Sequence, residues 1–195
     1  MNRSPNPFLV SALTEESPVV KTKEILSWID QRRSAHRFVV EPIPFSEMKE
    51  WGFEPDTGNI THSSGKFFTI HGVHIETNGG PVTSWSQPII KQPEIGILGI
   101  AVKKMGGVLH FLMQAKMEPG NIHLVQLAPT LQATRSNFTR VHHGRSPLLL
   151  DYFSTGEKSR SLVDVLQSEQ GARFLRKRNL NMIVEVTDDI PVSDD

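Results

Sequence analysis

Hydrophobic and polar residues alternate through the middle of the chain, most clearly between residues 66 and 134. Short runs rich in apolar and β-branched residues are separated there by turn residues, as in KFFTIHGVHIET, VTSWSQPII and IGILGIAVKKM. Such runs are typical of strands. Met105-Gly106-Gly107 and Glu118-Pro119-Gly120-Asn121 have the composition of tight turns, because Pro fixes φ and Gly accepts positive φ. The pattern predicts a sheet-forming centre.

Other patterns surround this centre. Apolar residues recur at helical spacing from Thr22 to about Ala35, which predicts a helix. A second, short helix is expected to start near Ser46. The spacing of apolar residues in 159–179 predicts one broken helix or two consecutive helices. The polar stretch 52–65 is expected to form a loop, and residues 181–186 a last strand.

The length of 195 residues fits one domain with its own core. Helices on both sides of a β-rich centre indicate an α+β fold rather than a repeated βαβ arrangement. We expect residues 1–21 to form an N-terminal arm, residues 22–187 a single domain, and residues 188–195 an acidic tail.

Alternation in the runs before and after residues 118–121 sorts the side chains onto two faces. Odd positions from 109 to 117 are apolar, which predicts that they face the core. The opposite face carries His110, Gln114, Lys116 and Glu118 in the first run, and Gln126, Thr130, Gln132 and Thr134 in the second. Each run therefore has one apolar and one polar face.

These two runs are predicted to pair as a hairpin. The register that keeps both apolar faces together sets Gln114 opposite Gln126 and Lys116 opposite Leu124, with a three-residue loop at 119–121. A two-residue turn would mix the faces, so it is rejected. In the predicted register the two polar faces merge into one surface.

Two interpretations of this polar surface are open. An antiparallel hairpin with one buried face commonly exposes its other face to water. A solvated face is usually rich in Lys, Glu and Thr, whereas this one is rich in Gln, with single charges of each sign. Amide side chains offer donors and an acceptor, which suits the recognition of carbonyl and imide groups. The composition favours a selective binding face.

Residues 135–145 follow the second run and contain three arginines among Ser, Asn, Thr and His residues. Guanidinium groups bind phosphate oxygens in a bidentate manner, so this loop suits a phosphate or pyrophosphate. The alternative is a basic surface loop whose arginines pair with scattered carboxylates.

Charge and composition argue against several classes of function. The chain has 21 Lys and Arg residues against 21 Asp and Glu residues, so no net charge favours nucleic acid or a membrane surface. The lack of cysteine excludes disulfides, thiolate metal sites and cysteine nucleophiles, and is compatible with a reducing cytoplasm. No signal peptide or membrane span is apparent. We expect a cytoplasmic protein.

Common cofactor and metal motifs are also missing from the sequence. There is no GxGxxG fingerprint, no GxxxxGK[ST] loop and no GxSxG elbow. His71 and His74 are three residues apart in a predicted strand, so their side chains point to opposite faces. A zinc site is therefore disfavoured, and no metal site is predicted.

The runs SWSQPIIKQPEIGILGI, GVLHFLMQAKMEPGNIHLVQLAPTLQATRSNFTRVHHG and TGNITHSSGKFFTIHGVHIET together resemble the sugar-nucleotide 2,3-dehydratase family. The resemblance implies a Nudix-like α+β fold with a mixed or antiparallel sheet, without a metal or organic cofactor. It also implies a dTDP-4-keto-6-deoxyglucose substrate. Family members typically contain two copies of this domain, whereas one is present here. The chain is therefore expected to form a homodimer, or to be part of a longer protein.

The implied reaction is an elimination of water across C2 and C3 of the sugar. Its site needs a base for the C3 proton, an electrophile for the C4 oxygen and a proton source for the leaving hydroxyl. As hypotheses, Glu118 or His110 transfers protons, and Lys116 or Arg135 stabilises the oxyanion. The candidates for substrate binding are Gln114, Gln126, Gln132, Trp85, Asn137, Phe138, Arg140 and Arg145.

Each of these roles has an alternative in which the residue is structural. Trp85 is a candidate for stacking on thymine but could belong to the core, and His110 could be an ordinary strand histidine. Arg145 could lie on the surface without a ligand. Lys116 and Glu118 could pair with each other along one strand face. A single-domain relative that binds the nucleotide sugar without turnover is the alternative function.

Overall fold

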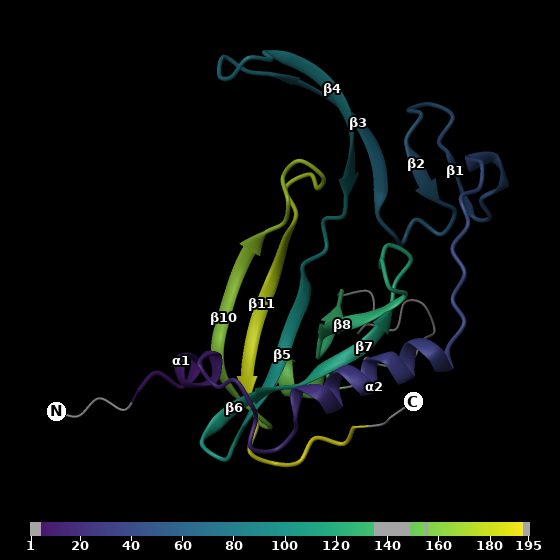
Figure 1. Cartoon of the computed structure of the whole chain (residues 1–195). Helices are drawn as coiled ribbons and strands as arrows, with labels where there is room; N and C mark the ends of the chain where they lie inside the picture. Colours follow the sequence, from purple (N-terminus) through teal and green to yellow (C-terminus); the bar gives the residue numbers. More distant parts are fainter. Residues whose placement is uncertain (1–4, 135–148, 155, 193–195) are drawn as a thin grey trace.

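The computed structural model describes residues 5–134, 149–154 and 156–192, which form an α+β arrangement (Figure 1). Three sheets are present among these residues, and the helices are few and short except for one. The α+β class predicted from the sequence is confirmed. The likeness to a Nudix fold stays a prediction.

The main sheet has the strand order β10-β11-β5-β6, and β9 also pairs with β5. Its β11–β5 pair is parallel, and its other pairs are antiparallel. The strands are β5 (Gly96–Met105), β6 (Val108–Phe111), β9 (Leu131–Ala133), β10 (Arg160–Ser168) and β11 (Arg178–Glu185). The long strand β5 lies at the centre. Along one edge it pairs first with β9 and then with β6.

Strand β10 corrects the prediction of helices in residues 159–179. Leu162 and Leu166 are four residues apart, which fits a helix, but Val163 and Val165 also alternate as in a strand. Residues of β10 pair with β11 along the whole strand, with a bulge next to Ser161. The ladder with β11 therefore decides between two patterns that the local sequence leaves equal.

The core lies on the main sheet where α4 (Asp151–Ser154) covers it. Phe153 of α4 is 5% exposed and packs in a cluster with residues of β5, β9 and β11. Gly99 of β5 leaves room for this ring, since a Cβ atom there would lie 2.3 Å from Phe153 Cε1. The buried residues of the cluster are Ala101, Leu131, Ala133, Phe153, Val184 and Val186.

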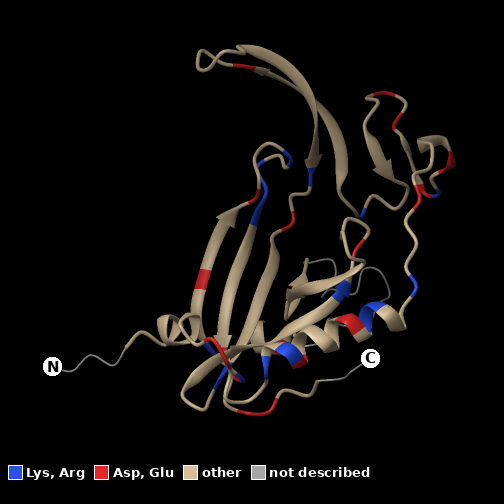
Figure 2. Ribbon diagram, in the orientation of Figure 1, with Lys and Arg blue, Asp and Glu red and all other residues tan. Residues whose placement is uncertain are grey.

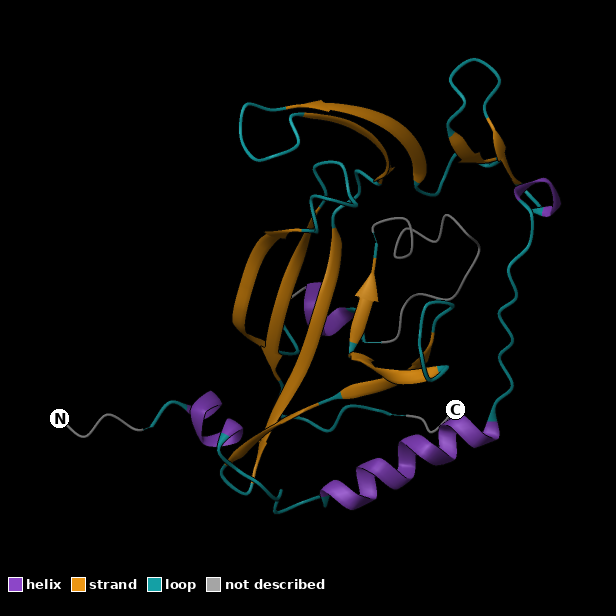
Figure 3. Cartoon of the chain, turned by 45° about the horizontal axis from the view of Figure 1, so that its top comes forward, coloured by secondary structure: helices purple, strands orange, loops and turns teal. Residues whose placement is uncertain are grey.

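A second sheet, of order β1-β2-β3-β4, projects from the main sheet (Figures 1 and 3). Its strands are β1 (Trp51–Phe53), β2 (Ile60–His62), β3 (Thr69–Glu76) and β4 (Ser84–Lys91). We call β3–β4 the long hairpin. Residues 52–53 and 60–62 of the predicted loop 52–65 belong instead to β1 and β2, and the predicted helix near Ser46 is reduced to the short 3-10 helix η1 (Phe45–Glu47). Trp51 contacts the rings of His62 and Phe68, which stabilises this turn-rich segment.

Two helices precede the sheets. The helix α2 (Thr22–Ala35) has the bounds predicted from the sequence, and α1 (Pro7–Ala12) lies within the segment predicted to be an N-terminal arm. Helix α1 packs against β6, and α2 packs against β8. The apolar side chains predicted on one face of α2 are only partly buried, because Ile29 is 6% exposed whereas Leu26 is 59% exposed.

The ribbon positions of Lys and Arg and those of Asp and Glu are scattered over the described chain, and long stretches of the strands carry neither (Figure 2). In the predicted acidic tail, Asp189 forms an ion pair with Lys103 of β5, with 2.6 Å between Oδ1 and Nζ. Ile190 packs against the core cluster. None of the described helices has the length and apolarity that crossing a membrane would require.

Candidate functional site

The predicted hairpin is present as β7 (Met113–Met117) and β8 (Val125–Pro129), which we call the short hairpin. It forms a sheet separate from the main one. The chain leaves the main sheet after β6 and returns to it at β9, with Leu112 and Thr130 as the single residues between strands. We call the place defined by these two residues the fork.

The register of the short hairpin corrects the predicted one by two residues. Lys116 lies opposite Gln126, and Gln114 lies opposite Ala128 rather than Gln126. Even positions still face even positions, so the predicted merging of the two polar faces survives the shift. The apolar face, in contrast, is not fully covered, since Met117 is 40% exposed.

The loop of the short hairpin is longer than predicted and is closed by Asn121. The Asn121 Nδ2 group donates to the carbonyl oxygens of Lys116 and Leu124, both at 3.1 Å, and its backbone N–H donates to Glu118 at 3.0 Å. Leu124 has a φ of 57°. The ladder ends at the pair of Met117 and Val125, and beyond it the Asn121 side chain bonds to the backbone. Residues 118–124 therefore form the connection, rather than the predicted 119–121.

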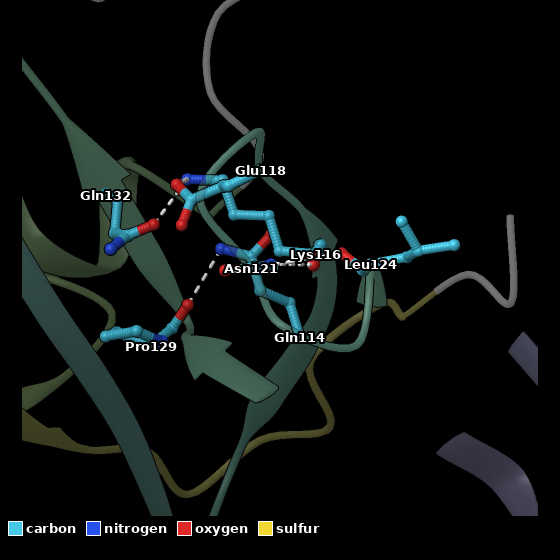
Figure 4. A network of polar contacts seen from close by, with 7 residues as sticks. All are labelled: Gln114, Lys116, Glu118, Asn121, Leu124, Pro129 and Gln132. Atoms are coloured by element: carbon cyan, nitrogen blue, oxygen red, sulfur yellow. Dashed lines mark hydrogen bonds and ion pairs between the residues drawn. The ribbon is translucent and has the colours of Figure 1, made fainter. Parts of the chain in front are cut away.

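Lys116 is the centre of a polar cluster that joins two strands across the fork (Figure 4). Its Nζ lies 2.9 Å from Glu118 Oε1 and also donates to Gln132 Oε1. Gln132 belongs to β9 and lies opposite Leu98 of β5. We call Lys116, Glu118 and Gln132 the Lys116 cluster. Its ion pair is half-exposed, with side-chain exposures of 32% for Lys116 and 46% for Glu118.

The pairing of Lys116 with Glu118 is the arrangement that the sequence left open as a structural alternative. An ammonium group has three hydrogens, and two acceptors of the cluster take two of them. The remaining hydrogen suits a further oxygen acceptor, such as a sugar carbonyl. The same contact can therefore hold the lysine in place and present it to a ligand.

The other glutamines of the polar face have different environments. Gln114 Nε2 donates to the carbonyl oxygen of Pro129 at 2.8 Å, which uses one of its two amide hydrogens within the fold (Figure 4). Gln126 is half-buried opposite Lys116. Both lie on the short hairpin with Lys116.

Two other predicted site residues, His110 and Trp85, do not join the Lys116 cluster. His110 lies on β6, where its Nε2 is 2.6 Å from Ser17 Oγ and its Nδ1 is 3.0 Å from the carbonyl oxygen of Val108. Trp85 is 40% exposed on β4, and its Nε1 donates to Gln87 Oε1 at 2.9 Å. The candidates outside the described residues are Arg135, Asn137, Phe138, Arg140 and Arg145.

Arg33 is a cation near the short hairpin that the sequence did not single out. Its Nε donates to the carbonyl oxygen of Val125 at 3.1 Å, and its Nη1 forms an ion pair with Asp30 at 2.8 Å. Arg33 comes from α2, so no local spacing links it to β8. Only the packing of α2 against the hairpin brings them together.

A second polar cluster lies at the start of β11 and shares no residue with the short hairpin. Lys177 is 4% exposed and donates to the carbonyl oxygen of Glu94. Burial lowers the pKa of Lys177, and the nearby carboxylates of Glu169 and Glu94 offset part of this effect. Asn179 donates to Glu169 and accepts from the backbone N–H of Gly96 at 3.0 Å. This cluster fixes the backbone before β5.

Two further kinds of site concern the described part of the chain, a hollow and a metal cluster. An open hollow on α2 is lined by Lys23, Glu24, Ser27, Trp28 and Gln31, and none of these belongs to the Lys116 cluster. No group of three or more His, Asp or Glu side chains is arranged to hold a metal ion, among the residues described.

The known proteins that are similar to this chain indicate its family. The family model of NDP-hexose 2,3-dehydratase matches residues 22–195. A dTDP-4-dehydro-6-deoxy-alpha-D-glucopyranose 2,3-dehydratase of Amycolatopsis orientalis is 54% identical over 191 residues, which are 95% of this chain and 41% of that protein. Proteins of the same name from Saccharopolyspora spinosa and Streptomyces violaceoruber are 50% and 46% identical, over 96% and 91% of this chain.

The chain spans about two fifths of the length of these curated relatives, since it covers 41%, 39% and 40% of them. The matched region nevertheless includes α2, all the strands and the polar face of the short hairpin. The chain belongs to the NDP-hexose 2,3-dehydratase family.

Proposed function

We propose that this chain eliminates water across C2 and C3 of a dTDP-4-keto-6-deoxyhexose, without a cofactor, in deoxysugar biosynthesis. The observation that carries the proposal is the Lys116 cluster, in which an ammonium, a carboxylate and an amide meet on one half-exposed face. The named relatives support the substrate class, and the resemblance extends over 95% of this chain in the first of them.

The chemistry of the substrate defines what the cluster would have to do. The C4 carbonyl acidifies the proton on C3, and the C2 hydroxyl is β to that carbonyl. Loss of the C3 proton gives an enolate, and the electron pair then expels the C2 hydroxyl as water. A fixed cation at the C4 oxygen and a base at C3 are therefore the two main requirements.

In the proposed mechanism, Lys116 donates a hydrogen bond to the C4 oxygen as negative charge develops there. Glu118, which lies 2.9 Å from Lys116 Nζ, accepts the C3 proton and can return it to the leaving hydroxyl. Gln132 holds the ammonium in position, while Gln114 and Gln126 orient the sugar or the base. His110 remains a second candidate for proton transfer, but it would first have to leave Ser17.

The residues proposed to bind the diphosphate and the thymine are those predicted from the sequence. Arg140 and Arg145 would hold the diphosphate, Arg135 and Asn137 would assist near the sugar, and Phe138 would stack on the base. Arg33 adds a second cation at the edge of the short hairpin, where it contacts Val125. A cytoplasmic location remains part of the proposal.

We also propose that the chain forms a homodimer. Large apolar side chains are exposed on its second sheet and on the segment before it, among them Phe45 at 58%, Phe53 at 61% and Trp85 at 40%. Exposed apolar side chains on a sheet are suited to contact with another protein, so the second sheet would gain from a covering partner. A molecular mass from gel filtration or sedimentation tests this part.

A second candidate function is binding of the nucleotide sugar without turnover. The observation that favours it is the length of the relatives, because this chain spans 41% of the first of them. A residue or surface in the remaining part of such a protein could be needed for the elimination. In that case this chain would act as a binding or scaffolding module.

Incubation of the purified chain with the dTDP-4-keto-6-deoxyglucose substrate separates the two candidates. Mass spectrometry should detect loss of water, and calorimetry should measure binding of dTDP and of the sugar nucleotide. Turnover supports the dehydratase. Binding without turnover supports the second candidate, and a lack of both contradicts the proposal. dTDP-glucose, which has no C4 carbonyl, is the control ligand for elimination.

A further inference from the structure

One edge of strand β5 changes its partner between Gly99 and Val102. Gly99 is the last residue of β5 paired with β9, opposite Leu131. Val102 is the first residue paired with β6, opposite Phe111. Ile100 and Ala101 lie between these two ladders, and Ala101 is 1% exposed. Its backbone N–H and carbonyl group therefore need partners that neither ladder supplies in the regular way.

Thr130 completes the hydrogen bonding at this point. Its Oγ1 accepts from the Ala101 N–H at 2.9 Å and donates to the carbonyl oxygen of Leu112 at 2.5 Å. The Leu112 N–H in turn donates to the Ala101 carbonyl oxygen at 2.9 Å. One hydroxyl thus connects β5 to both branches of the fork. Thr130 is 9% exposed, so water does not readily replace it.

The fork lies at the start of the two branches that the Lys116 cluster joins. Lys116 lies on β7, four residues after Leu112, whereas Gln132 lies on β9, two residues after Thr130. The contact between their side chains spans the two branches (Figure 4). Any change in the angle between the branches at Leu112 and Thr130 moves the ammonium relative to the amide.

We propose that Thr130 is a positioning residue of the site, because its hydroxyl ties both branches of the fork to Ala101 and thereby keeps the Lys116 ammonium on Gln132. The role of this positioning in catalysis rests on the proposed function. The arrangement of the fork itself does not. Thr130 does not touch the ligand-facing atoms of the cluster in this scheme, so its effect is transmitted through the backbone of β7 and β9.

The test compares Thr130→Val, which keeps the shape and loses the hydroxyl, with Thr130→Ser, which keeps the hydroxyl. The readout is the side-chain amide signal of Gln132 in the 1H–15N spectrum of the full chain, assigned by its loss in Gln132→Met. Lys116→Met supplies the position of this signal when the cross-fork contact is absent. Ser159→Ala is the matched control, since Ser159 also donates to a backbone carbonyl, that of Tyr152, outside the fork.

We expect the Gln132 signal of Thr130→Val to move to the position seen in Lys116→Met, while Thr130→Ser and Ser159→Ala keep the wild-type position. In the turnover assay, kcat should fall about tenfold or more in Thr130→Val and be largely restored in Thr130→Ser. A wild-type Gln132 signal in Thr130→Val would overturn the proposal. So would an equal loss of kcat in Ser159→Ala.

Two further outcomes are distinguishable. If the wild-type chain shows neither turnover nor binding, the proposed function fails, whereas the Gln132 signal still tests the fork. If Thr130→Val does not fold, Thr130→Cys takes its place, because a thiol is a weak donor and acceptor. An intermediate displacement of the Gln132 signal is then expected, and an unchanged signal would contradict the role of Thr130.

Discussion

The long hairpin and the short hairpin are attached to the rest of the protein in different ways. The long hairpin, β3–β4, has eight paired positions and is attached near its base by backbone bonds of Ile90 to Arg173 and Leu175, both at 2.8 Å. The short hairpin, β7–β8, has five paired positions, and side chains attach it at Thr130, Lys116 and Arg33.

The two hairpins also differ in the polarity of their faces. On the long hairpin, Ile75 lies opposite Trp85, and Val73 lies on the same face two residues away. This face is mostly apolar, with Gln87 opposite Val73, and it is incompletely covered, since Trp85 is 40% exposed. On the short hairpin, Lys116 and Gln126 face each other on a half-buried polar surface. The hairpin attached through its backbone thus has the more apolar face, whereas the hairpin attached through side chains has the polar one.

The largest effect is expected from the polar face of the short hairpin. Lys116→Ala should lower kcat/KM of the proposed elimination about 100-fold, because a fixed donor to a developing oxyanion is lost. Glu118→Gln should lower kcat by about the same order, since an amide cannot accept the C3 proton. Steady-state kinetics measures both, with Lys158→Ala as the control, because Lys158 forms an exposed ion pair with Asp151 at 3.2 Å. Unchanged rates in both variants would remove these residues from the mechanism.

The next largest effect concerns the apolar face of the long hairpin. Ile75→Asp should weaken the proposed homodimer about 30-fold or more, since a charge would be buried at an apolar contact. Sedimentation at several protein concentrations measures this. Ser86→Asp is the matched control on the opposite face of the same hairpin. If the two variants sediment alike, the apolar face is not the interface.

A smaller, pH-dependent effect is expected near the base of the long hairpin, where Lys177 donates to the carbonyl oxygen that precedes β5. Burial lowers the pKa of Lys177 below 10.5, so the folded chain loses this proton at a lower pH than the unfolded chain. Between the two pKa values the unfolded state binds more protons, and the free energy of unfolding therefore rises with pH.

Urea unfolding of the wild type and of Lys177→Met, at several pH values up to 10.5, tests this sign. The difference in the free energy of unfolding, wild type minus variant, should increase as pH rises through this window. A difference that stays constant or decreases would show that Lys177 keeps its proton in the fold.

The smallest effect is expected from the ion pair between Lys103 and Asp189, which serves as a baseline for the Lys116 cluster. The hydrogen bond from Lys103 and its charge lower the pKa of Asp189, but the carboxylate is fully exposed. Any stabilisation is present above pH 3.8 and is lost as pH falls through the lowered pKa of the folded state.

Asp189→Asn should therefore leave the thermal unfolding midpoint close to that of the wild type at neutral pH, and high salt should remove any difference. A large difference that persists in salt would contradict this expectation. If Glu118→Gln changes the midpoint no more than Asp189→Asn does, the ion pair of the Lys116 cluster has little structural role.

The shared polar face of the short hairpin was predictable from alternation. The polar positions Gln114, Lys116 and Gln126 share one face in the structure, as predicted, because a register shift of two residues preserves the face of every side chain. The shift itself was not predictable. The Asn121 side chain closes the connection by bonding to the backbone of Lys116 and Leu124, and such a bond leaves no periodic signal in the sequence.

The sequence by itself determined the elements whose local pattern allows one structure. The helix α2 and the turn at Gly106 and Gly107, with φ values of 57° and 84°, belong to this group. Alternation also determined which side chains of the short hairpin share a face. These features depend on residues close together along the chain, so local spacing and turn chemistry are sufficient to specify them.

Only the tertiary structure decided the features that depend on distant partners. Residues 160–168 became a strand because β11 supplied a ladder, although their spacing fits a helix equally well. The contact of Lys116 with Gln132, and that of Thr130 with Ala101, exist because β5 changes its partner at the fork. Buried backbone groups must find partners, and which residues supply them depends on how the strands meet in space.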